Sequence, residues 1–236
     1  MLRPAQSDTN AVWVSRVLDH DPQYTVAGLV SRDYPAFVRI LHPAFAADGG
    51  PVAWRAIADA VGGTVHPSVQ WHRLESKIEP HTVEALGLRT DQGGFAPEIG
   101  DLSIRPMWSL FPVLAAHTKD LTCMAAYWIG RGGAQGWPVA PHICIPEHRR
   151  EWEYALFSGT LTDVLEQREL DGPLEFSPNF LWPLDRAWLL STQEDFDSTI
   201  VGGTESLIAD IRSQRLLETV PVSPSVSLAN DADTVN

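Results

Sequence analysis

The clearest alternation of apolar and polar positions lies in the C-terminal third of the chain. In that third, the pattern predicts strands over 186–192 and 198–201, a helix after Thr204 and a last strand over 217–222. Within the helical part, apolar residues recur at helical spacing at Leu207, Ile208 and Ile211, and Thr204 is a suitable N-cap. An acidic turn, Glu194 to Asp197, separates the first two strands. The stretch therefore predicts strand, turn, strand, helix and strand.

The rest of the chain gives a less regular pattern. It predicts further strands over 24–30, 37–41, 69–74, 121–129, 143–145 and 153–158, and helices over 54–61, from about 106 and over 161–167. Residues 11–18 fit either a helix or an edge strand, and residues 75–97 are typical of a long surface loop.

Without regular βαβ spacing, we expect an α+β fold with a mixed, largely antiparallel sheet packed by three or four helices. We expect one domain over residues 1–222 and a disordered, polar tail over 223–236.

The net charge of the chain limits the classes of partner that it is expected to bind. The 236 residues include 30 acidic and 17 basic side chains, a formal net charge of −13. Such a chain lacks the basic footprint that phosphate recognition needs, so we expect neither nucleic-acid nor anionic-membrane binding. No stretch approaches the roughly 20 apolar residues of a membrane span, and the first residues lack an apolar signal core. We therefore expect a soluble, cytoplasmic protein.

Cysteine and tryptophan usage adds little chemistry. Cys123 and Cys144 both lie in apolar runs and form no Cys-x-x-Cys unit, which predicts buried thiols in a reducing compartment. The nine tryptophans are spread over the whole length. This spread favours packing roles for most of them and leaves a minority to line an interface.

Two glycine-rich stretches invite a phosphate-binding interpretation. The segment GRGGAQG, residues 130–136, lacks the terminal Gly-Lys-Ser/Thr of a nucleotide P-loop, so a flexible loop is the better interpretation. Gly202 and Gly203 precede a predicted helix, whose first N–H groups can hold an anion. Asp195 and Asp197 lie nearby and oppose an anion, so turn chemistry is favoured there.

Metal and histidine chemistry is similarly sparse. Asp195 and Asp197 have the alternation of a carboxylate cation site, but the remaining ligands of an EF-hand are absent and a solvated turn is favoured. The eight histidines include no His-Glu-x-x-His set. We therefore expect no metal and no cofactor. His42 and His66 each precede a proline at a predicted strand end, where each either takes part in binding or satisfies a local carbonyl.

Four blocks of the chain carry a resemblance. They are ILHPAF (40–45), HPSVQW (66–71), SPNFLWPLDRAWLLST (177–192) and DSTIVGG (197–203). Together they resemble a family of uncharacterised proteins of high-GC Gram-positive bacteria, in which similar blocks recur in the same order. The resemblance implies one fold unit across most of the chain and no particular activity.

Two functional hypotheses follow. The first is a non-catalytic binding module, immunity-like or regulatory, for a small ligand or for a protein partner whose basic surface would complement the acidic chain. The second is a hydrolase whose histidines and aspartates converge at one end of the sheet. The candidate binding residues are His42, His66, Trp182, Asp185, Arg186, Asp195, Asp197, Gly202 and Gly203.

Overall fold

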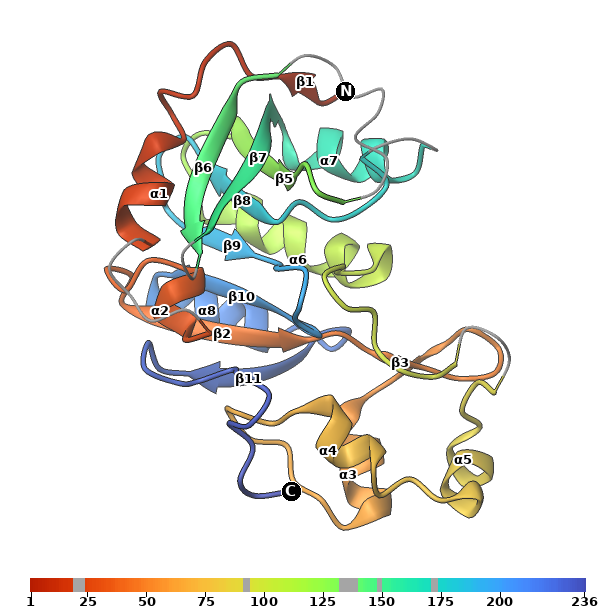
Figure 1. The fold of residues 1–236 in the computed structure, drawn as a ribbon. Coiled ribbons are helices and arrows are strands. Elements are labelled where there is room, and N and C mark those ends of the chain that lie inside the picture. The colour runs from red at the N-terminus through yellow and green to blue at the C-terminus, as the bar shows by residue number, and fades with distance from the viewer. Residues whose placement is uncertain (19–23, 91–93, 132–139, 148–149, 171–173) are drawn as a thin grey trace.

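A nine-stranded sheet organises the chain (Figure 1). The computed structural model describes residues 1–18, 24–90, 94–131, 140–147, 150–170 and 174–236. In spatial order the strands are β1 (Arg3–Pro4), β7 (Arg150–Gly159), β5 (Cys123–Trp128), β8 (Phe180–Pro183), β9 (Leu189–Ser191), β10 (Ser198–Gly203), β2 (Ala36–Leu41) and β11 (Glu218–Val222), and β6 (His142–Glu147) also pairs with β7. Every strand pairing among the described residues is antiparallel. The predicted α+β class with a largely antiparallel sheet is confirmed.

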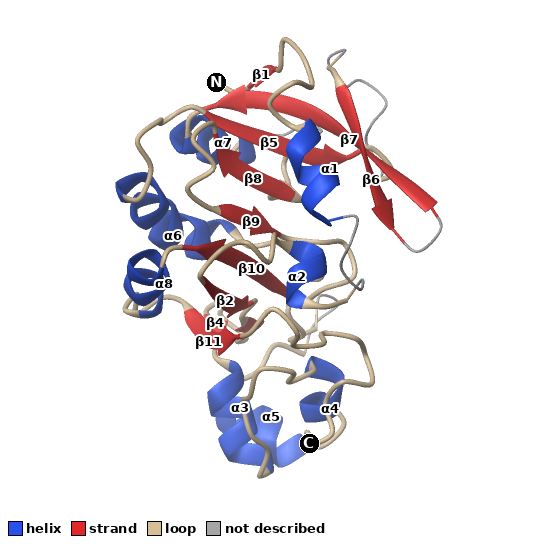
Figure 2. Ribbon diagram, turned by 90° about the vertical axis from the view of Figure 1, so that its left-hand side faces the viewer, coloured by secondary structure: helices blue, strands red, loops and turns tan. Residues whose placement is uncertain are grey.

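Helices cover both faces of this sheet (Figure 2). One face carries α6 (Ile104–Ala116), α7 (Leu161–Arg168) and α8 (Glu205–Arg212), and the other carries α1 (Val12–Leu18) and α2 (Val26–Leu29). Successive side chains of a strand point to opposite faces, so Val38 and Ile40 of β2 join the core beneath α6 and α8, whereas Phe37 joins the core beneath α1 and α2. Among the described residues no helix combines the length and apolarity that crossing a membrane requires.

Side-chain caps start several of these helices. The Thr204 hydroxyl accepts a hydrogen bond from the Leu207 amide at 3.2 Å, which confirms the predicted start of α8. Thr160 and Asp163 form a capping box at the start of α7, which the spacing also predicts as a helix. Local sequence therefore determines where these helices begin.

Residues 44–90 and 94–97 form a lobe beside the sheet. It contains β3 (Ala44–Phe45), β4 (Pro51–Val52), α3 (Trp54–Val61), α4 (Trp71–Glu75) and α5 (Pro80–Leu86). Its core is centred on Trp54 and Trp71, whose ring centroids are 5.3 Å apart, and it is continuous with Leu41 and Val220 of the sheet. The lobe is thus attached to the edge of the sheet formed by β2 and β11.

Two predicted strands are helices in the structure. Residues 24–30 contain α2 (Val26–Leu29), whose first turn is capped by the Thr25 hydroxyl, which accepts a hydrogen bond from the Gly28 amide. Residues 69–74 were expected to be a half-buried strand, but Trp71 and Leu74 lie three residues apart on the buried side of α4. Over so short a segment, the same apolar residues fit either periodicity. Residues 11–18 contain helix α1, and the predicted 75–97 loop contains α5, with Pro80 at its start.

The tail over 223–236 is packed against the rest of the chain, so the prediction of disorder is wrong. Leu228 is buried between the helices of one face, and its amide donates to the Tyr24 carbonyl at 2.7 Å. Asp233 is 2% exposed, and its carboxylate accepts hydrogen bonds from the amides of Gln70, Val235 and Asn236. The polar composition of the tail concealed these specific contacts.

Cysteine and tryptophan burial follows the predictions only in part. Cys123 is buried as expected, whereas Cys144 is exposed, so the prediction of two buried thiols is wrong for Cys144. Trp54, Trp182 and Trp188 are fully buried, which agrees with packing roles.

A single buried cation joins the sheet to the lobe. Arg39 of β2 is 0% exposed. Its guanidinium donates to Ser198 Oγ at 2.8 Å and to Asp197 Oδ1 at 3.1 Å on the sheet side. On the lobe side it donates to the carbonyls of Pro67 and Val69 at 3.2 and 2.7 Å. Burial lowers the pKa of Arg39, and the neighbouring Asp197 carboxylate acts in the opposite direction.

Replacing Arg39 should therefore cost far more stability than replacing an exposed arginine. We expect Arg39→Met to lower the free energy of unfolding by about 3–5 kcal/mol, because it leaves the Asp197 carboxylate and two carbonyls without their donor. Arg73→Met, at an exposed position of α4, is the matched control and should change stability by less than about 0.5 kcal/mol. Equal losses in urea titrations of the two variants would contradict this account.

The Asp233 contact makes the tail sensitive to acid. Burial raises the pKa of Asp233, but the hydrogen bonds from Asn236, Gln70 and Val235 outweigh it and hold the pKa well below its usual range. The stabilisation is complete above the unfolded pKa of about 3.9 and is lost as the pH falls through the lower folded pKa. Asp233→Asn should be less stable than the wild type at pH 7, and the difference should shrink below about pH 4. Thermal melts from pH 7 to pH 2 measure this, and a constant difference would show that ionisation of Asp233 is irrelevant.

Candidate functional site

The strand register separates the predicted site residues into two groups. Leu41 pairs with Ser198, so His42 and Asp197 lie together at one end of the sheet, and the His42 amide donates to the Asp197 carbonyl at 2.9 Å. Leu189 pairs with Gly202, which places Asp185 and Arg186 at the opposite end. The two groups do not converge on one site.

The two histidines among the predicted site residues, His42 and His66, have structural roles. His42 is 0% exposed, and its ring nitrogens contact the Glu98 carbonyl at 2.7 Å and Thr199 Oγ1 at 3.0 Å. Burial lowers the pKa of His42. His66 Nε2 lies 2.9 Å from Asp233 Oδ1, and so it helps to fix the tail. Both histidines thus satisfy local acceptors or donors.

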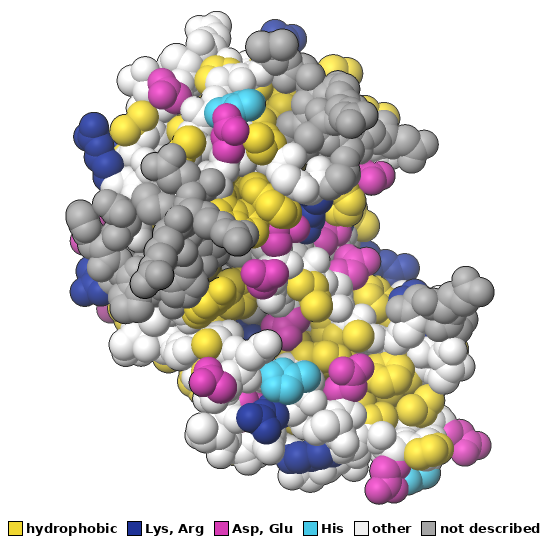
Figure 3. Space-filling model, viewed as in Figure 1, with side chains coloured by type: hydrophobic (Ala, Val, Ile, Leu, Met, Phe, Trp, Pro, Cys, Tyr) yellow, Lys and Arg dark blue, Asp and Glu magenta, His cyan; other side chains and the backbone are white. Residues whose placement is uncertain are grey.

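The acidic turn gives no cation site. Asp197 turns inward to Arg39, whereas Asp195 is exposed and borders a hollow of about 480 Å³ near Leu228. In the part of the chain that the structure describes, no group of three histidine, cysteine or carboxylate side chains is placed to hold a metal ion. On the face of the molecule seen in Figure 3, acidic side chains gather where the sheet meets the lobe.

Residues of the second group also have structural contacts. The Asp185 carboxylate accepts hydrogen bonds from Thr118 Oγ1 at 2.9 Å and the Lys119 amide at 2.7 Å. The Arg186 guanidinium lies 5.0 Å from the centroid of the Trp13 ring. Trp182 is fully buried and donates to the Asn10 carbonyl at 3.2 Å.

Gly202 and Gly203 lie inside β10, not in a turn before α8. A Cβ atom on Gly202 would lie 2.8 Å from the Tyr34 ring, and one on Gly203 would lie 2.6 Å from Leu207. The absence of a side chain here allows α8 and the Tyr34 loop to pack closely on the strand.

The structure instead offers a groove that sequence reasoning missed. It consists of two adjoining hollows of about 440 and 610 Å³ between the lobe, α6 and β11, and we call it the proline groove. Both hollows share Pro43, Pro51, Pro106 and Leu216. The smaller hollow is completed by Ile40, Leu41, Ala53, Arg55, Arg215, Leu217, Glu218 and Thr219, and the larger by Phe45, Gly49, Ser103, Ile104, Arg105 and Trp108.

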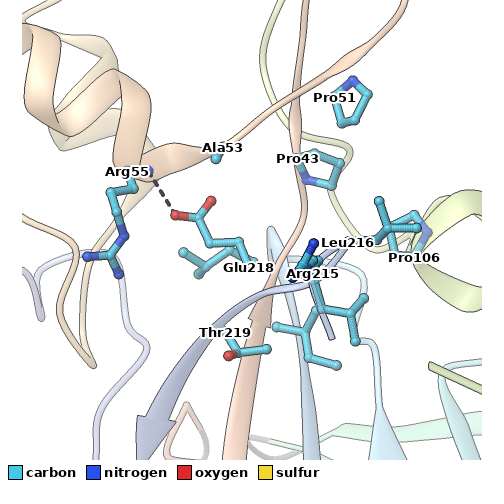
Figure 4. A pocket seen from close by; sticks show the side chains of 12 residues that line it. Pro43, Pro51, Ala53, Arg55, Pro106, Arg215, Leu216, Glu218 and Thr219 are labelled. Atoms are coloured by element: carbon cyan, nitrogen blue, oxygen red, sulfur yellow. Dashed lines mark hydrogen bonds between the residues drawn. The ribbon is translucent and has the colours of Figure 1, made fainter. Parts of the chain in front are cut away.

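Proline and strand-end geometry give the groove firm walls. Pro43 follows the last residues of β2, Pro51 begins β4, and Pro106 lies in the first turn of α6. Each ring fixes its backbone φ, so the shared wall has little conformational freedom to lose on binding. Figure 4 shows the prolines at one end of the smaller hollow and Arg55 with Glu218 at the other.

Two large apolar side chains are exposed at the larger hollow. Trp108 of α6 is 52% exposed, and Leu216, just before β11, is 72% exposed. They are 108 positions apart in the sequence, yet they line the same hollow. Exposed apolar surface that meets in one concave site is typical of a binding surface.

Glu218 links the groove to the start of α3. Its carboxylate accepts hydrogen bonds from the backbone amides of Trp54 at 2.5 Å and Arg55 at 2.8 Å, and the second of these is drawn in Figure 4. Ala53, the N-cap residue, provides no side-chain cap, so Glu218 serves that purpose from a distant strand. Burial raises the pKa of Glu218, while the two amides and the Arg55 charge act in the opposite direction.

The groove is locally basic in an acidic chain. Arg55, Arg105 and Arg215 are exposed at its walls, and none of them forms an ion pair with another described residue. Glu218 is the one carboxylate among the described lining residues. These residues include no histidine or cysteine that could act with Ser103 or Thr219 as a base or nucleophile. The arrangement of exposed apolar side chains and arginines suits binding.

Sequence reasoning missed the groove because its lining comes from three distant segments, 40–55, 103–108 and 215–219. One local signal was available. Leu216 and Leu217 are adjacent at the start of a strand, where neighbouring side chains point in opposite directions, so one of them had to face outward.

Comparisons with protein-family models, with curated proteins and with solved structures find no match. The fold and the groove are therefore interpreted from their own geometry, and the resemblance noted in the sequence stays a prediction.

Removing the Glu218 cap should destabilise α3 and the wall of the groove. We expect Glu218→Ala to lower the free energy of unfolding by about 1–2 kcal/mol, because two amides at a helix start lose their acceptor. Glu205→Ala is the control, because Glu205 is an exposed first-turn residue of α8 whose N-cap, Thr204, is intact. Chemical denaturation measures both variants, and a Glu218→Ala variant as stable as the wild type would show that the cap contributes nothing.

Proposed function

We propose that this protein is a non-catalytic binding module and that the proline groove is its binding surface. The observation that carries the proposal is the meeting of exposed Trp108 and Leu216 over one apolar hollow of about 610 Å³. Hollows of this size lie within the range of ligand sites, and exposed aromatic and aliphatic side chains are their usual anchors. A regulatory or immunity-like protein acts in this way, through association alone.

The alternative, a hydrolase, has less support. It requires His42, His66, Asp185, Arg186, Asp195 and Asp197 to converge at one end of the sheet. The register places Asp185 and Arg186 at the end opposite to His42 and Asp197. No observation on the described residues favours a catalytic site elsewhere, so binding is the function that the geometry supports best.

A selection experiment tests this proposal without knowledge of the natural ligand. A library of random peptides displayed on phage is panned against the wild type, Leu216→Asp and Leu121→Asp. Leu121 is 60% exposed and lies outside the groove, so its variant is a matched control for Leu216.

We expect the wild type and Leu121→Asp to enrich the same peptides, and Leu216→Asp to lose them, because a buried aspartate opposes apolar contact. Neither substitution removes buried surface, so both variants should melt within a few degrees of the wild type. Peptides enriched equally by Leu216→Asp, or no enrichment by the wild type, would contradict the proposal.

A further inference from the structure

We infer that the occupant of the proline groove is an acidic protein segment: a stretch of chain with two large apolar side chains flanked by aspartate or glutamate. This inference rests on the proposed function and names the chemistry of the partner. It differs from the basic partner that net charge alone suggested, because the groove and the chain as a whole have opposite charge.

The number of anchors follows from the two hollows. They lie side by side and share the wall formed by Pro43, Pro51, Pro106 and Leu216. A single large side chain can occupy one hollow only, and the apolar part of the other hollow's lining would then stay in contact with water. Two large side chains on one segment remove both surfaces from water, which is the main favourable contribution to such binding.

The sign of the partner's charge follows from three arginines. Arg55 and Arg215 line the smaller hollow, and Arg105 lines the larger one. Each is exposed and without an ion pair to a described residue, so each guanidinium is available to a carboxylate in the fork geometry that arginine favours.

The one carboxylate of the lining offsets only part of this positive charge. Glu218 already accepts two hydrogen bonds from the α3 backbone, and its position at the helix start is fixed by them. Asp48 adds one further carboxylate at the margin, beside the lining residues Gly49 and Pro51, and it accepts a hydrogen bond from the Gly50 amide at 2.8 Å. Among the lining residues themselves, three arginines stand against one glutamate, so the lining carries a net positive charge.

Other occupants leave part of this arrangement unused. A fatty acid has one carboxylate and cannot pair with arginines at both hollows. A basic segment would bring like charge to three exposed guanidinium groups, which is unfavourable. A segment with several carboxylates and two apolar anchors uses the hollows and the arginines together.

Three synthetic peptides test the inference. They have the same length and two phenylalanines at the same positions, and they differ only in carrying glutamate, glutamine or lysine at the other positions. Binding is measured by fluorescence anisotropy to the wild type, to Arg105→Glu/Arg215→Glu and to Arg16→Glu/Arg73→Glu. The two double variants have the same net charge, but Arg16 and Arg73 are exposed outside the groove.

We expect the glutamate peptide to bind the wild type about tenfold or more tightly than the glutamine peptide, and the lysine peptide to bind most weakly. Reversal of charge in the groove should weaken the glutamate peptide about tenfold or more, and the control reversal less than about threefold. Added salt should weaken the glutamate peptide most. If the reversed variant fails to fold, Arg105→Gln/Arg215→Gln provides the same comparison.

The outcomes separate this inference from the proposed function. The glutamine or lysine peptide could instead bind the wild type as tightly as the glutamate peptide does and fail to bind Leu216→Asp. This result would overturn the inference of an acidic partner and leave the groove as the binding surface. Equal weakening by both double variants would show a general charge effect and would also overturn the inference. Dodecanoate, a fatty acid, is tested in the same way. If it binds and no peptide does, the occupant of the groove is a lipid-like ligand and the inference of a protein segment is overturned. No binding by any of these, together with an empty phage selection, would overturn both proposals.

Discussion

The buried guanidinium of Arg39 is the interaction on which the arrangement of the two parts of the molecule depends. A cation without solvent must be fully hydrogen-bonded, and its partners come from β10 and from the lobe segment that precedes α4. Apolar contacts alone would allow the lobe to slide on the edge of the sheet, because they are not directional. The hydrogen bonds of Arg39 are directional and favour the observed position of the lobe. The lobe therefore behaves as part of the same folded unit.

The proline groove is a consequence of that position of the lobe. Its walls come from the lobe, from α6 and from the start of β11, so its shape exists only while these elements hold their positions. Glu218 adds a second connection, since a strand residue caps a helix of the lobe. With proline walls and two long-range polar connections, little order remains to be gained on binding, which favours affinity for a ligand of matching shape.

Sequence patterns predicted the fold class and most of the longer elements, because α6, α7, α8 and the central strands depend on local periodicity. Side-chain caps also mark the starts of α7 and α8. They failed for 24–30 and 69–74, where one threonine cap and the contacts of Trp71 with Trp54 decide between helix and strand. They failed for the tail, where the amide of Gln70, far away in the sequence, helps to hold Asp233. The site was missed for the same reason: histidines and aspartates attract attention in a sequence, but here they stabilise the fold. The groove is formed by prolines, leucines and arginines that no motif connects.

The most direct test of the account is amide hydrogen exchange of the full chain with and without the glutamate peptide described above. We expect slower exchange in three segments that are far apart in the sequence, 40–55, 103–108 and 215–219, because they form one surface. The remaining described strands should be unaffected. The contrary result is slower exchange at the acidic turn 194–197, or at Trp128 and Trp152, whose ring centroids are 4.3 Å apart, with none at the three groove segments. It would show that the binding surface lies elsewhere and would contradict the proposal that the proline groove binds the partner.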